Sequence, residues 1–354
     1  MKVALMGGAY KNAGDFLIEN RSRRLIEEIL NADVTVLKRN IAYDSKIDEL
    51  EQYDLIVFAG GPIFNANVYP GGMPFIDDFE KLKVPVRILG GGWKGKDISA
   101  KSLYETCPCQ ESVLKFSKYY AQQSALGCRD WYTIRMLKLY GITNTIMTGC
   151  PAWYDMEKID KLELDKMYSE TSIKDEVTIG ISDAAFEENK KYFWDVINII
   201  NRYYSKAKIK VLFHRGISSV DEEQIRDICK RNNRIEYFDI SGSADGLKEY
   251  DDCFLHIGFR VHAHIYNLSQ GRASILINED ARGAGVNQAL GIENFNIEES
   301  NTSILRKRLI DGNIENKLLD YIDYIDKSNY YQYRRAMAGI RFTFDTMVEF
   351  IKEW

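Results

Sequence analysis

The sequence has little of what marks a disordered, secreted or membrane-spanning chain. Only six of its 354 residues are proline and 45% are apolar, which is typical of an ordered globular protein. No segment approaches the roughly 18 consecutive apolar residues of a membrane-spanning helix, so we expect no transmembrane segment. Residues 1–8 form one short apolar run without the extended core of a signal peptide. We therefore expect a cytoplasmic protein, either free or at the inner face of the membrane.

The sequence also lacks an excess of positive charge. It contains 47 Lys and Arg against 52 Asp and Glu, which gives a formal net charge of −5. A surface that binds nucleic acid needs a basic balance, so nucleic acid is excluded as the main partner. A site for a smaller anion must then be a local pocket.

Cysteine is scarce as well. Four of the six cysteines stand in or beside apolar segments, as reduced core residues do. Cys107 and Cys109 form a C-x-C pair, but without a second pair this is a weak metal signal. We therefore expect no metal and no bound cofactor.

The chain is long for a single core, so we expect two domains. Residues 1–155 alternate strand-like runs with amphipathic stretches, which is typical of a Rossmann-like domain. Residues 156–176 are rich in Lys, Glu and Asp and predict a linker, and a second alternating series fills residues 177–300. Residues 301–354 predict helices that pack across the domain junction. The expected fold class is α/β, with two facing Rossmann-like domains and a C-terminal helical segment.

In an open parallel sheet, ligands bind beyond the carboxyl ends of the strands. The predicted strands are the short apolar runs at residues 3–6, 34–37, 55–59, 86–89, 125–128, 145–147, 177–181, 209–213, 235–240, 253–257 and 274–277. Glycine-rich loops follow three of them, at residues 7–15, 60–65 and 90–95. We expect these loops to line one crevice and to let the backbone approach a polar ligand.

Residues 258–264 are the strongest candidate for a reactive site. Arg260 and His262 stand between a predicted strand and a predicted helix, where free helix N–H groups favour an anion. His262 and His264 would point about 200° apart on a helix, so only one can face the crevice. His214 and Arg215 also follow a strand and form the second candidate.

Another charged pair, Arg129 and Asp130, follows the strand at 125–128. Its plainest interpretation is that Asp130 caps the helix at 131–139 while Arg129 is exposed. Residues 90–95 match the dinucleotide pattern G-x-G-x-x-G, but no clear helix opens on them and no ribose-binding acid follows. The chain has no P-loop ending, no Asp-x-Asp pair and no G-x-S-x-G elbow. These absences disfavour nucleotide hydrolysis, metal-dependent sugar transfer and a serine triad.

Read together, several short motifs resemble those of the polysaccharide pyruvyl transferase family. They are Asn12-x-Gly14-Asp15, Gly60-Gly61, Gly90-Gly91-Gly92-Trp93, Arg129-Asp130, Gly149-Cys150-Pro151-Ala152 and Gly258-x-Arg260-x-His262-Ala263. Members of the family resemble two-domain glycosyltransferases of the GT-B type. They move a pyruvyl group from phosphoenolpyruvate onto sugar hydroxyls as a ketal. The resemblance therefore implies phosphoenolpyruvate as co-substrate and, as acceptor, a sugar of a cell-surface polysaccharide precursor, either lipid-linked or nucleotide-linked.

The chain departs from the family at one place. After residue 277 the family often has a Tyr-Asp-x-Lys-like element, whereas this chain has the run Asn278-Glu279-Asp280-Ala281-Arg282-Gly283. This departure leaves the identity of the acceptor open.

Phosphoenolpyruvate carries a carboxylate and a phosphate, so its pocket needs several cations or helix N-termini. The expected donor-binding residues are Arg129, His214, Arg215 and Arg260. We expect His262 to act as acid and then as base, assisted by Glu279. The expected acceptor-binding residues belong to the first domain and are Asn12, Asp15, Gly60, Gly61, Asn65, Gly91, Gly92 and Trp93.

Two other functions stay open on the sequence. One is a metal-independent GT-B-like glycosyltransferase that uses a nucleotide sugar, because the same helix start could bind a diphosphate. The other is a catalytically silent sugar-binding protein, because a fold does not establish an activity. The oligomeric state is open too, and a homo-oligomer is one of the alternatives.

Overall fold

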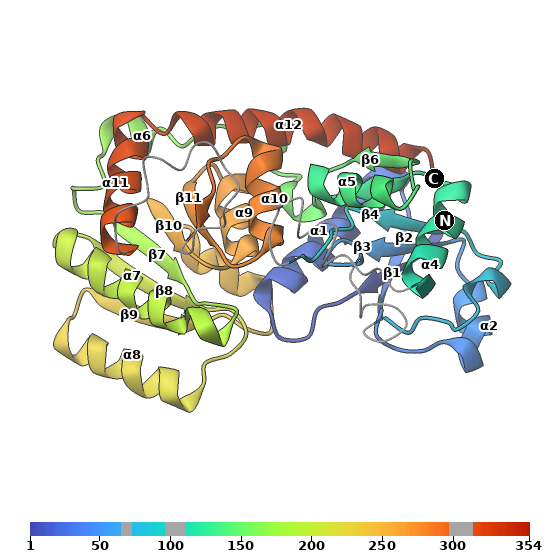
Figure 1. Ribbon diagram of the computed structural model, residues 1–354, viewed down its shortest axis with the longest axis horizontal. Helices are drawn as coiled ribbons and strands as arrows, with labels where there is room; N and C mark the ends of the chain where they lie inside the picture. Colours follow the sequence, from blue (N-terminus) through green and yellow to red (C-terminus); the bar gives the residue numbers. More distant parts are fainter. Residues whose placement is uncertain (65–72, 96–110, 297–313) are drawn as a thin grey trace.

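A computed structural model describes residues 1–64, 73–95, 111–296 and 314–354. Two α/β units lie side by side, and a long C-terminal helix runs along both of them (Figure 1). Each unit has a sheet of parallel strands, and the strands alternate with helices along the chain. The predicted fold class of two facing Rossmann-like domains with a C-terminal helical segment is thereby confirmed.

The first unit holds a sheet in the order β2-β1-β3-β4, and β5 and β6 pair beside it. A bridge between Gly91 and Cys128 joins the two parts. Its elements are β1 (Lys2–Gly7), α1 (Ala13–Leu30), β2 (Asp33–Lys38), α2 (Ile47–Glu51), β3 (Leu55–Ala59), β4 (Val86–Leu89), α4 (Glu111–Gln123), β5 (Leu126–Cys128), α5 (Trp131–Leu139) and β6 (Thr145–Met147). β3 is buried along its whole length, because both faces of the sheet are covered.

The second unit holds a sheet in the order β12-β11-β10-β7-β8-β9. Its elements are β7 (Thr178–Ser182), α7 (Lys190–Tyr203), β8 (Lys208–Phe213), α8 (Ser219–Arg231), β9 (Ile235–Asp239), β10 (Leu255–Gly258), α9 (Val261–Ser269), β11 (Ala273–Asn278), α10 (Ala281–Leu290) and β12 (Phe295–Asn296). The strand order reverses direction at β7 and β10, and this is where ligands bind in open sheets of this kind.

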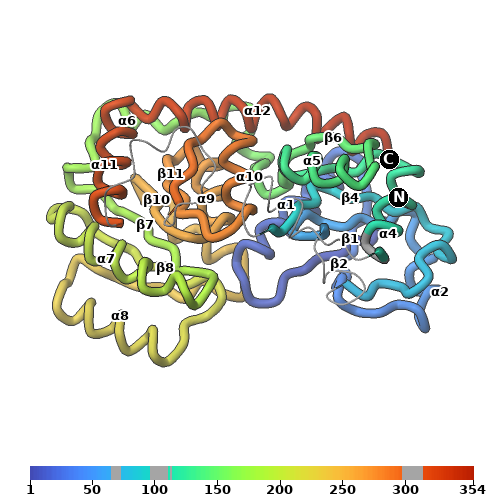
Figure 2. Tube along the Cα trace, viewed as in Figure 1, coloured from blue at the N-terminus to red at the C-terminus, as the bar shows by residue number. Residues whose placement is uncertain are grey.

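Three further helices, α6 (Met167–Glu170), α11 (Ile314–Lys327) and α12 (Tyr331–Lys352), lie outside the two sheets. α12 packs on α9 and α10 of the second unit and on α1 of the first. It ends beside the first unit, so both chain ends lie there (Figure 2). No helix in the described ranges is both long and apolar enough to cross a membrane.

Local patterns located most elements within one or two residues. The strand predicted at 253–257 instead runs from Leu255 to Gly258, because the N–H of Cys253 is still bonded to the carbonyl of Tyr250 in the preceding turn. α10 has no counterpart among the predicted elements. Its glycines weaken the helical signal, yet they let it pack closely: a Cβ on Gly285 would lie 3.0 Å from Cγ of Asp130. The contact brings the N-terminus of α10 to the first unit.

Candidate functional site

A pocket lies between the two units. The first unit contributes Asn12, Asp15, Gly61, Pro62 and Arg129. The second contributes Ala185, His214, Phe259, Arg260, Val261, His262, Leu276, Ile277, Asn278, Glu279, Asp280, Arg282 and Gly283. The structure therefore brings candidate residues from both ends of the chain to one place.

The N-termini of several helices meet at this pocket. Asn12 is the N-cap of α1, Arg260 is the N-cap of α9, and Asp280 is the N-cap of α10. Arg129 stands one residue before Asp130, which caps α5 by accepting the N–H of Thr133 at 2.8 Å. The positive ends of four helix dipoles thus surround one space, which favours a bound anion.

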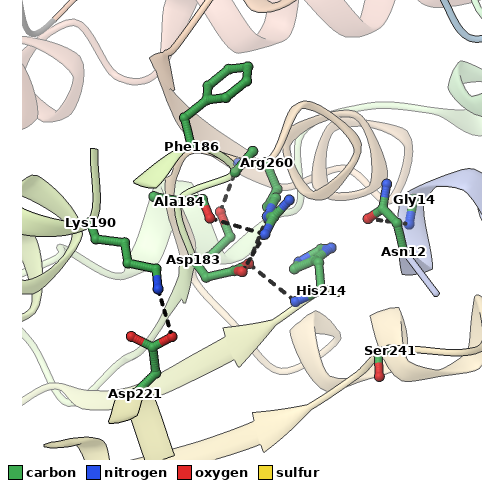
Figure 3. A network of polar contacts seen from close by, with 12 residues as sticks. Asn12, Gly14, Asp183, Ala184, Phe186, Lys190, His214, Asp221, Ser241 and Arg260 are labelled. Carbon is green, nitrogen blue, oxygen red and sulfur yellow. Dashed lines mark hydrogen bonds and ion pairs between the residues drawn. The ribbon is translucent and has the colours of Figure 1, made fainter. Parts of the chain in front are cut away.

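Arg260 is held by a carboxylate that the sequence did not single out. Its Nε donates to Oδ1 of Asp183 at 2.8 Å, and its Nη2 bonds Oδ2 of Asp183 and the carbonyl of Ala184 (Figure 3). Both side chains are buried, with 8% and 7% exposure for Arg260 and Asp183. The bidentate pair fixes the plane of the guanidinium at the pocket wall. Asp183 directly follows β7, and this position at a strand end is the signal that could have found it.

His262 lies at the pocket wall and packs against the first unit. A Cβ placed on Gly14 would lie only 2.4 Å from its Nδ1, so its ring rests directly on the Gly14 backbone. Burial, together with the positive charges of Arg129, Arg282 and Arg260, lowers the pKa of His262 to about 3. The imidazole is therefore neutral at physiological pH.

His264 points away from the pocket, as the helical spacing predicted. It is fully buried, and its Nδ1 is 2.8 Å from Oγ of Ser274. The same hydroxyl bonds Nδ1 of His256 at 2.7 Å, and Nε2 of His256 bonds Oγ of Ser182 at 2.9 Å. Ser182 also accepts the N–H of Arg260 at 3.1 Å. Through Ser274 and Ser182, these two histidines thus help to hold the turn at Arg260 in place.

If His262 has its predicted role as acid and base, we expect Gly14→Ala to reduce turnover about 10²-fold, because a displacement of roughly 1 Å at a reacting group costs that much. The added methyl group would overlap the His262 ring, while alanine suits the backbone of a helical first turn. The measurement is steady-state turnover together with the thermal unfolding temperature. Gly339→Ala is the matched control, because a Cβ there meets nothing within 4 Å. Equal turnover in Gly14→Ala and the control would show that the contact does not matter.

Arg129 is buried, so the expectation that it is exposed is wrong. Its Nε donates to Oδ2 of Asp130 at 3.0 Å and its Nη2 to the carbonyl of Trp93 at 3.3 Å. Gly92 leaves room for it, since a Cβ there would lie 2.4 Å from Cζ of Arg129. The carbonyl of Gly91 accepts its N–H at 2.9 Å. The third glycine loop therefore positions Arg129 at the pocket.

Arg282 is a pocket residue that the sequence analysis missed. Its guanidinium pairs with Asp280, with Nε 2.7 Å from Oδ2, and its charge depresses the pKa of His262. Asp280-x-Arg282 has the spacing of the Asp-x-Lys part of the family element described above. That spacing, read with arginine in place of lysine, is the signal that could have found it.

Glu279 lines the pocket, and its carboxylate accepts several hydrogen bonds from the turn after β7. It accepts the N–H groups of Ala185 and Phe186, both at 3.1 Å, and Nδ2 of Asn189 at 3.0 Å. Burial raises its pKa, whereas these donors and Arg260 lower it. Through these bonds Glu279 holds the turn after β7, which carries Asp183, and its catalytic role stays a prediction.

His214 forms the back wall of the pocket. Burial lowers its pKa well below the ordinary value, and Arg260 adds to that effect. Its Nε2 bonds the hydroxyl of Tyr250 at 2.8 Å, and its carbonyl accepts the N–H of Ala13 at 3.0 Å across the two units. It is therefore a neutral group at an inter-unit contact. Arg215 is exposed and is not among the residues that line the pocket, although its charge lowers the pKa of Asp15, which does line it.

The expected acceptor residues separate in the structure. Asn12, Asp15 and Gly61 reach the pocket, and the carbonyl of Gly60 accepts Nη1 of Arg39 at 3.3 Å. Trp93 does not reach it, because its side chain is 3% exposed within the core of the first unit. The expectation for Trp93 is thus wrong. Asn65, like Cys107 and Cys109, lies outside the described residues.

Comparison with known proteins agrees with this arrangement. The sequence matches the family described as Polysaccharide pyruvyl transferase over residues 12–280. A search of curated proteins finds no match. Among solved structures, the chain is similar to the S. aureus MnaA–UDP co-structure, with 12% identity, a TM-score of 0.60, and coverage of 99% of this chain and 96% of that one. It is also similar to UDP-GlcNAc 2-epimerase from Neisseria meningitidis bound to UDP-GlcNAc, with 12% identity, a TM-score of 0.59 and 100% coverage of both chains.

The likenesses to solved structures show the GT-B-like fold. The family match concerns the sequence itself. It runs from the N-cap of α1 to the N-cap of α10. It thus contains all the residues that line the pocket except Arg282 and Gly283. The chain belongs to the polysaccharide pyruvyl transferase family, and it is an enzyme that modifies a polysaccharide.

Proposed function

We propose that this enzyme transfers the pyruvyl group of phosphoenolpyruvate to two hydroxyls of a polysaccharide precursor sugar, forming a cyclic ketal. The donor takes the pocket between the two units, and the sugar approaches from the first unit. No cofactor takes part, since phosphoenolpyruvate is itself the activated substrate.

The observation that carries this proposal is the convergence of Arg129, Arg260 and Arg282 on one pocket. Each guanidinium is oriented by a carboxylate, on Asp130, Asp183 or Asp280. For Arg129 and Arg260, no described residue bonds the remaining Nη1. These groups and the surrounding helix N-termini suit a small ligand that carries a phosphate and a carboxylate on one carbon.

The neutral state of His262 fits an acid that is charged only when the donor is bound. The positive charges of the arginines keep the pKa of His262 low, and a bound trianionic donor would offset them. The pKa of His262 then rises, and the imidazolium can protonate the methylene carbon of the enol. The carbon that bears the phosphate becomes cationic, and a sugar hydroxyl attacks it. Phosphate leaves with the electron pair of its C–O bond, and a second hydroxyl closes the ketal.

The direct test is incubation with phosphoenolpyruvate and a panel of nucleotide-linked and lipid-linked sugars. We expect release of inorganic phosphate together with a sugar product whose mass has grown by one ketal-linked pyruvyl group. Thermal stability should rise with phosphoenolpyruvate. Stabilisation by nucleoside diphosphates instead, with no phosphate release across the panel, would favour the nucleotide-sugar transferase.

We expect Arg260→Lys to raise the KM for phosphoenolpyruvate about tenfold, because hydrogen bonds to charged groups are worth ~1.5–3 kcal/mol. A lysine has a single side-chain nitrogen. It therefore cannot bond both oxygens of Asp183 in the fork geometry of arginine while a further nitrogen points into the pocket. Arg272→Lys is the matched control, since Arg272 is also 8% exposed and ion-paired, to Asp251, but lies outside the pocket. An unchanged donor KM in Arg260→Lys would refute the anion-binding role.

A further inference from the structure

A buried threonine of the first unit, Thr133, bonds two of the groups that surround Arg129. Its Oγ1 accepts the backbone N–H of Trp93 at 2.9 Å. The hydroxyl keeps its own proton and donates it to Oδ1 of Asp130, also at 2.9 Å. Thr133 is fully buried, and none of the roles described so far uses its hydroxyl.

Together with the bonds of Arg129, these two bonds close a ring. Asp130 uses its other oxygen, Oδ2, to accept Nε of Arg129 at 3.0 Å. Nη2 of Arg129 donates to the carbonyl of Trp93 at 3.3 Å, so the Trp93 backbone supplies both a donor and an acceptor. Nη1 is the guanidinium nitrogen that the ring leaves without a described partner. Since Arg129 lines the donor pocket, Nη1 is the atom that a bound donor can engage.

The bonds of Thr133 differ from those usual at this position of a helix. Asp130 is the N-cap of α5, so Thr133 is the third residue of the helix. A capping box has Glu or Gln there, and that side chain returns to the backbone of the N-cap. A threonine inside a helix commonly bonds the carbonyl three or four residues earlier. Among the described residues the Thr133 hydroxyl does neither, because it joins the third glycine loop to the Asp130 carboxylate.

The packing around Asp130 leaves no easy substitute for this hydroxyl. Asp130 is 2% exposed and lies against α10 of the second unit: a Cβ on Gly285 would lie 3.1 Å from its Oδ2 and 3.3 Å from its Oδ1. Without the hydroxyl, Oδ1 keeps the backbone N–H of residue 133 as its one described donor, and the N–H of Trp93 loses its partner. Buried polar groups seek new partners, so the carboxylate would turn and the guanidinium of Arg129 would turn with it.

We propose that Thr133 is a positioning residue for the donor: through Asp130, it fixes the direction in which Arg129 presents Nη1 to the pocket. This inference rests on the proposed function and adds to its site a residue that does not line the pocket. Thr133 acts on the donor only through Arg129. The ring also gives Trp93 a role in which its backbone, and not its side chain, serves the site.

The first test is calorimetric binding of phosphoenolpyruvate to Thr133→Val, which keeps the shape of the side chain and removes the hydroxyl. We expect the Kd to rise about tenfold, the usual scale for one hydrogen bond to a charged group. Phosphate release at saturating donor should stay close to that of the wild-type enzyme, because the lost interaction is one of binding. Thr133→Ser retains the hydroxyl and should bind nearly as the wild-type protein does.

Thr343→Val is the matched control, since the Thr343 hydroxyl bonds the carbonyl of Gly339 within α12 and lies away from the pocket. An unchanged Kd in Thr133→Val, or an equal rise in Thr133→Ser, would overturn the inference. Should Thr133→Val not fold, Thr133→Cys replaces it, because a thiol is a weaker donor and acceptor than a hydroxyl. The expected rise in Kd is then about threefold, and no rise again overturns the inference.

A double-mutant cycle separates positioning from a general structural role. Thr133→Val should leave the Kd of Arg129→Gln unchanged, because the group that it would misplace is already absent. A similar rise in Kd in the Arg129→Gln and the wild-type backgrounds would show that Thr133 does not act through Arg129.

The Nε–H proton of Arg129 allows a measurement without any donor. Its signal in ¹H–¹⁵N spectra of the full chain is assigned by its absence in Arg129→Gln. We expect its exchange with water to be about tenfold faster in Thr133→Val than in the wild-type protein or Thr133→Ser. Equal exchange in Thr133→Val and the wild-type protein overturns the inference. A wild-type protein that does not bind phosphoenolpyruvate would instead overturn the proposed function and leave the exchange result standing.

Discussion

The His262→Ala variant is expected to release phosphate from phosphoenolpyruvate about 10² to 10⁴ times more slowly than the wild-type enzyme, the usual contribution of a general acid and base. The reason is its position: its imidazole lines the donor pocket at the start of α9 and rests on Gly14 of the other unit. The measurement is single-turnover phosphate release with saturating donor. It isolates the chemical step from product release.

Donor binding serves as the control for this variant. Arg129, Arg260 and Arg282 remain, each paired with its carboxylate, so calorimetry should give nearly the wild-type affinity for phosphoenolpyruvate. A variant that loses binding and turnover together would instead point to a structural role. Turnover close to that of the wild-type enzyme would refute the proposed role of His262.

The second large effect concerns stability in acid. We expect the free energy of unfolding to fall by roughly 4 kcal/mol between pH 6.5 and pH 5.5, about 1 kcal/mol for each histidine. Burial lowers the pKa of His214 and His256 well below the ordinary value and that of His262 and His264 to about 3. In the unfolded chain each titrates near pH 6.5. Below that pH the unfolded state binds more protons, so acid favours unfolding.

Two carboxyl groups act in the opposite direction. The raised pKa values of Asp15 and Glu279 let the folded state bind protons before the unfolded state does, which reduces the loss. Urea unfolding at several pH values, at constant ionic strength, measures the net slope. Phosphoenolpyruvate should raise the stability at each pH. A free energy of unfolding that stays level from pH 7.5 to pH 5.5 would contradict the neutral burial of the histidines.

Much of the fold was predictable because the signals are local. α5 begins and ends at the predicted residues, as do β3, β4 and β6. Each is a run whose apolar spacing or cap lies within a few residues. α10 was not predictable in this way, because its glycines are explained by contacts with residues outside the helix: Gly283 lies against Asn278, and Gly285 lies against Asp130 of the other unit.

In the candidate site, too, only the features that depend on neighbouring residues were predictable. The sequence by itself determined that Arg260 and His262 stand at a helix start after a strand and that His264 points away, since strand ends and helical periodicity follow from neighbouring residues. Only the tertiary structure decided that Asp183 holds Arg260, that Trp93 is buried, and that Glu279 is engaged by backbone N–H groups. Those outcomes depend on partners tens of residues away along the chain. Charge pairing and burial are properties of the packed chain, so no local pattern could carry them.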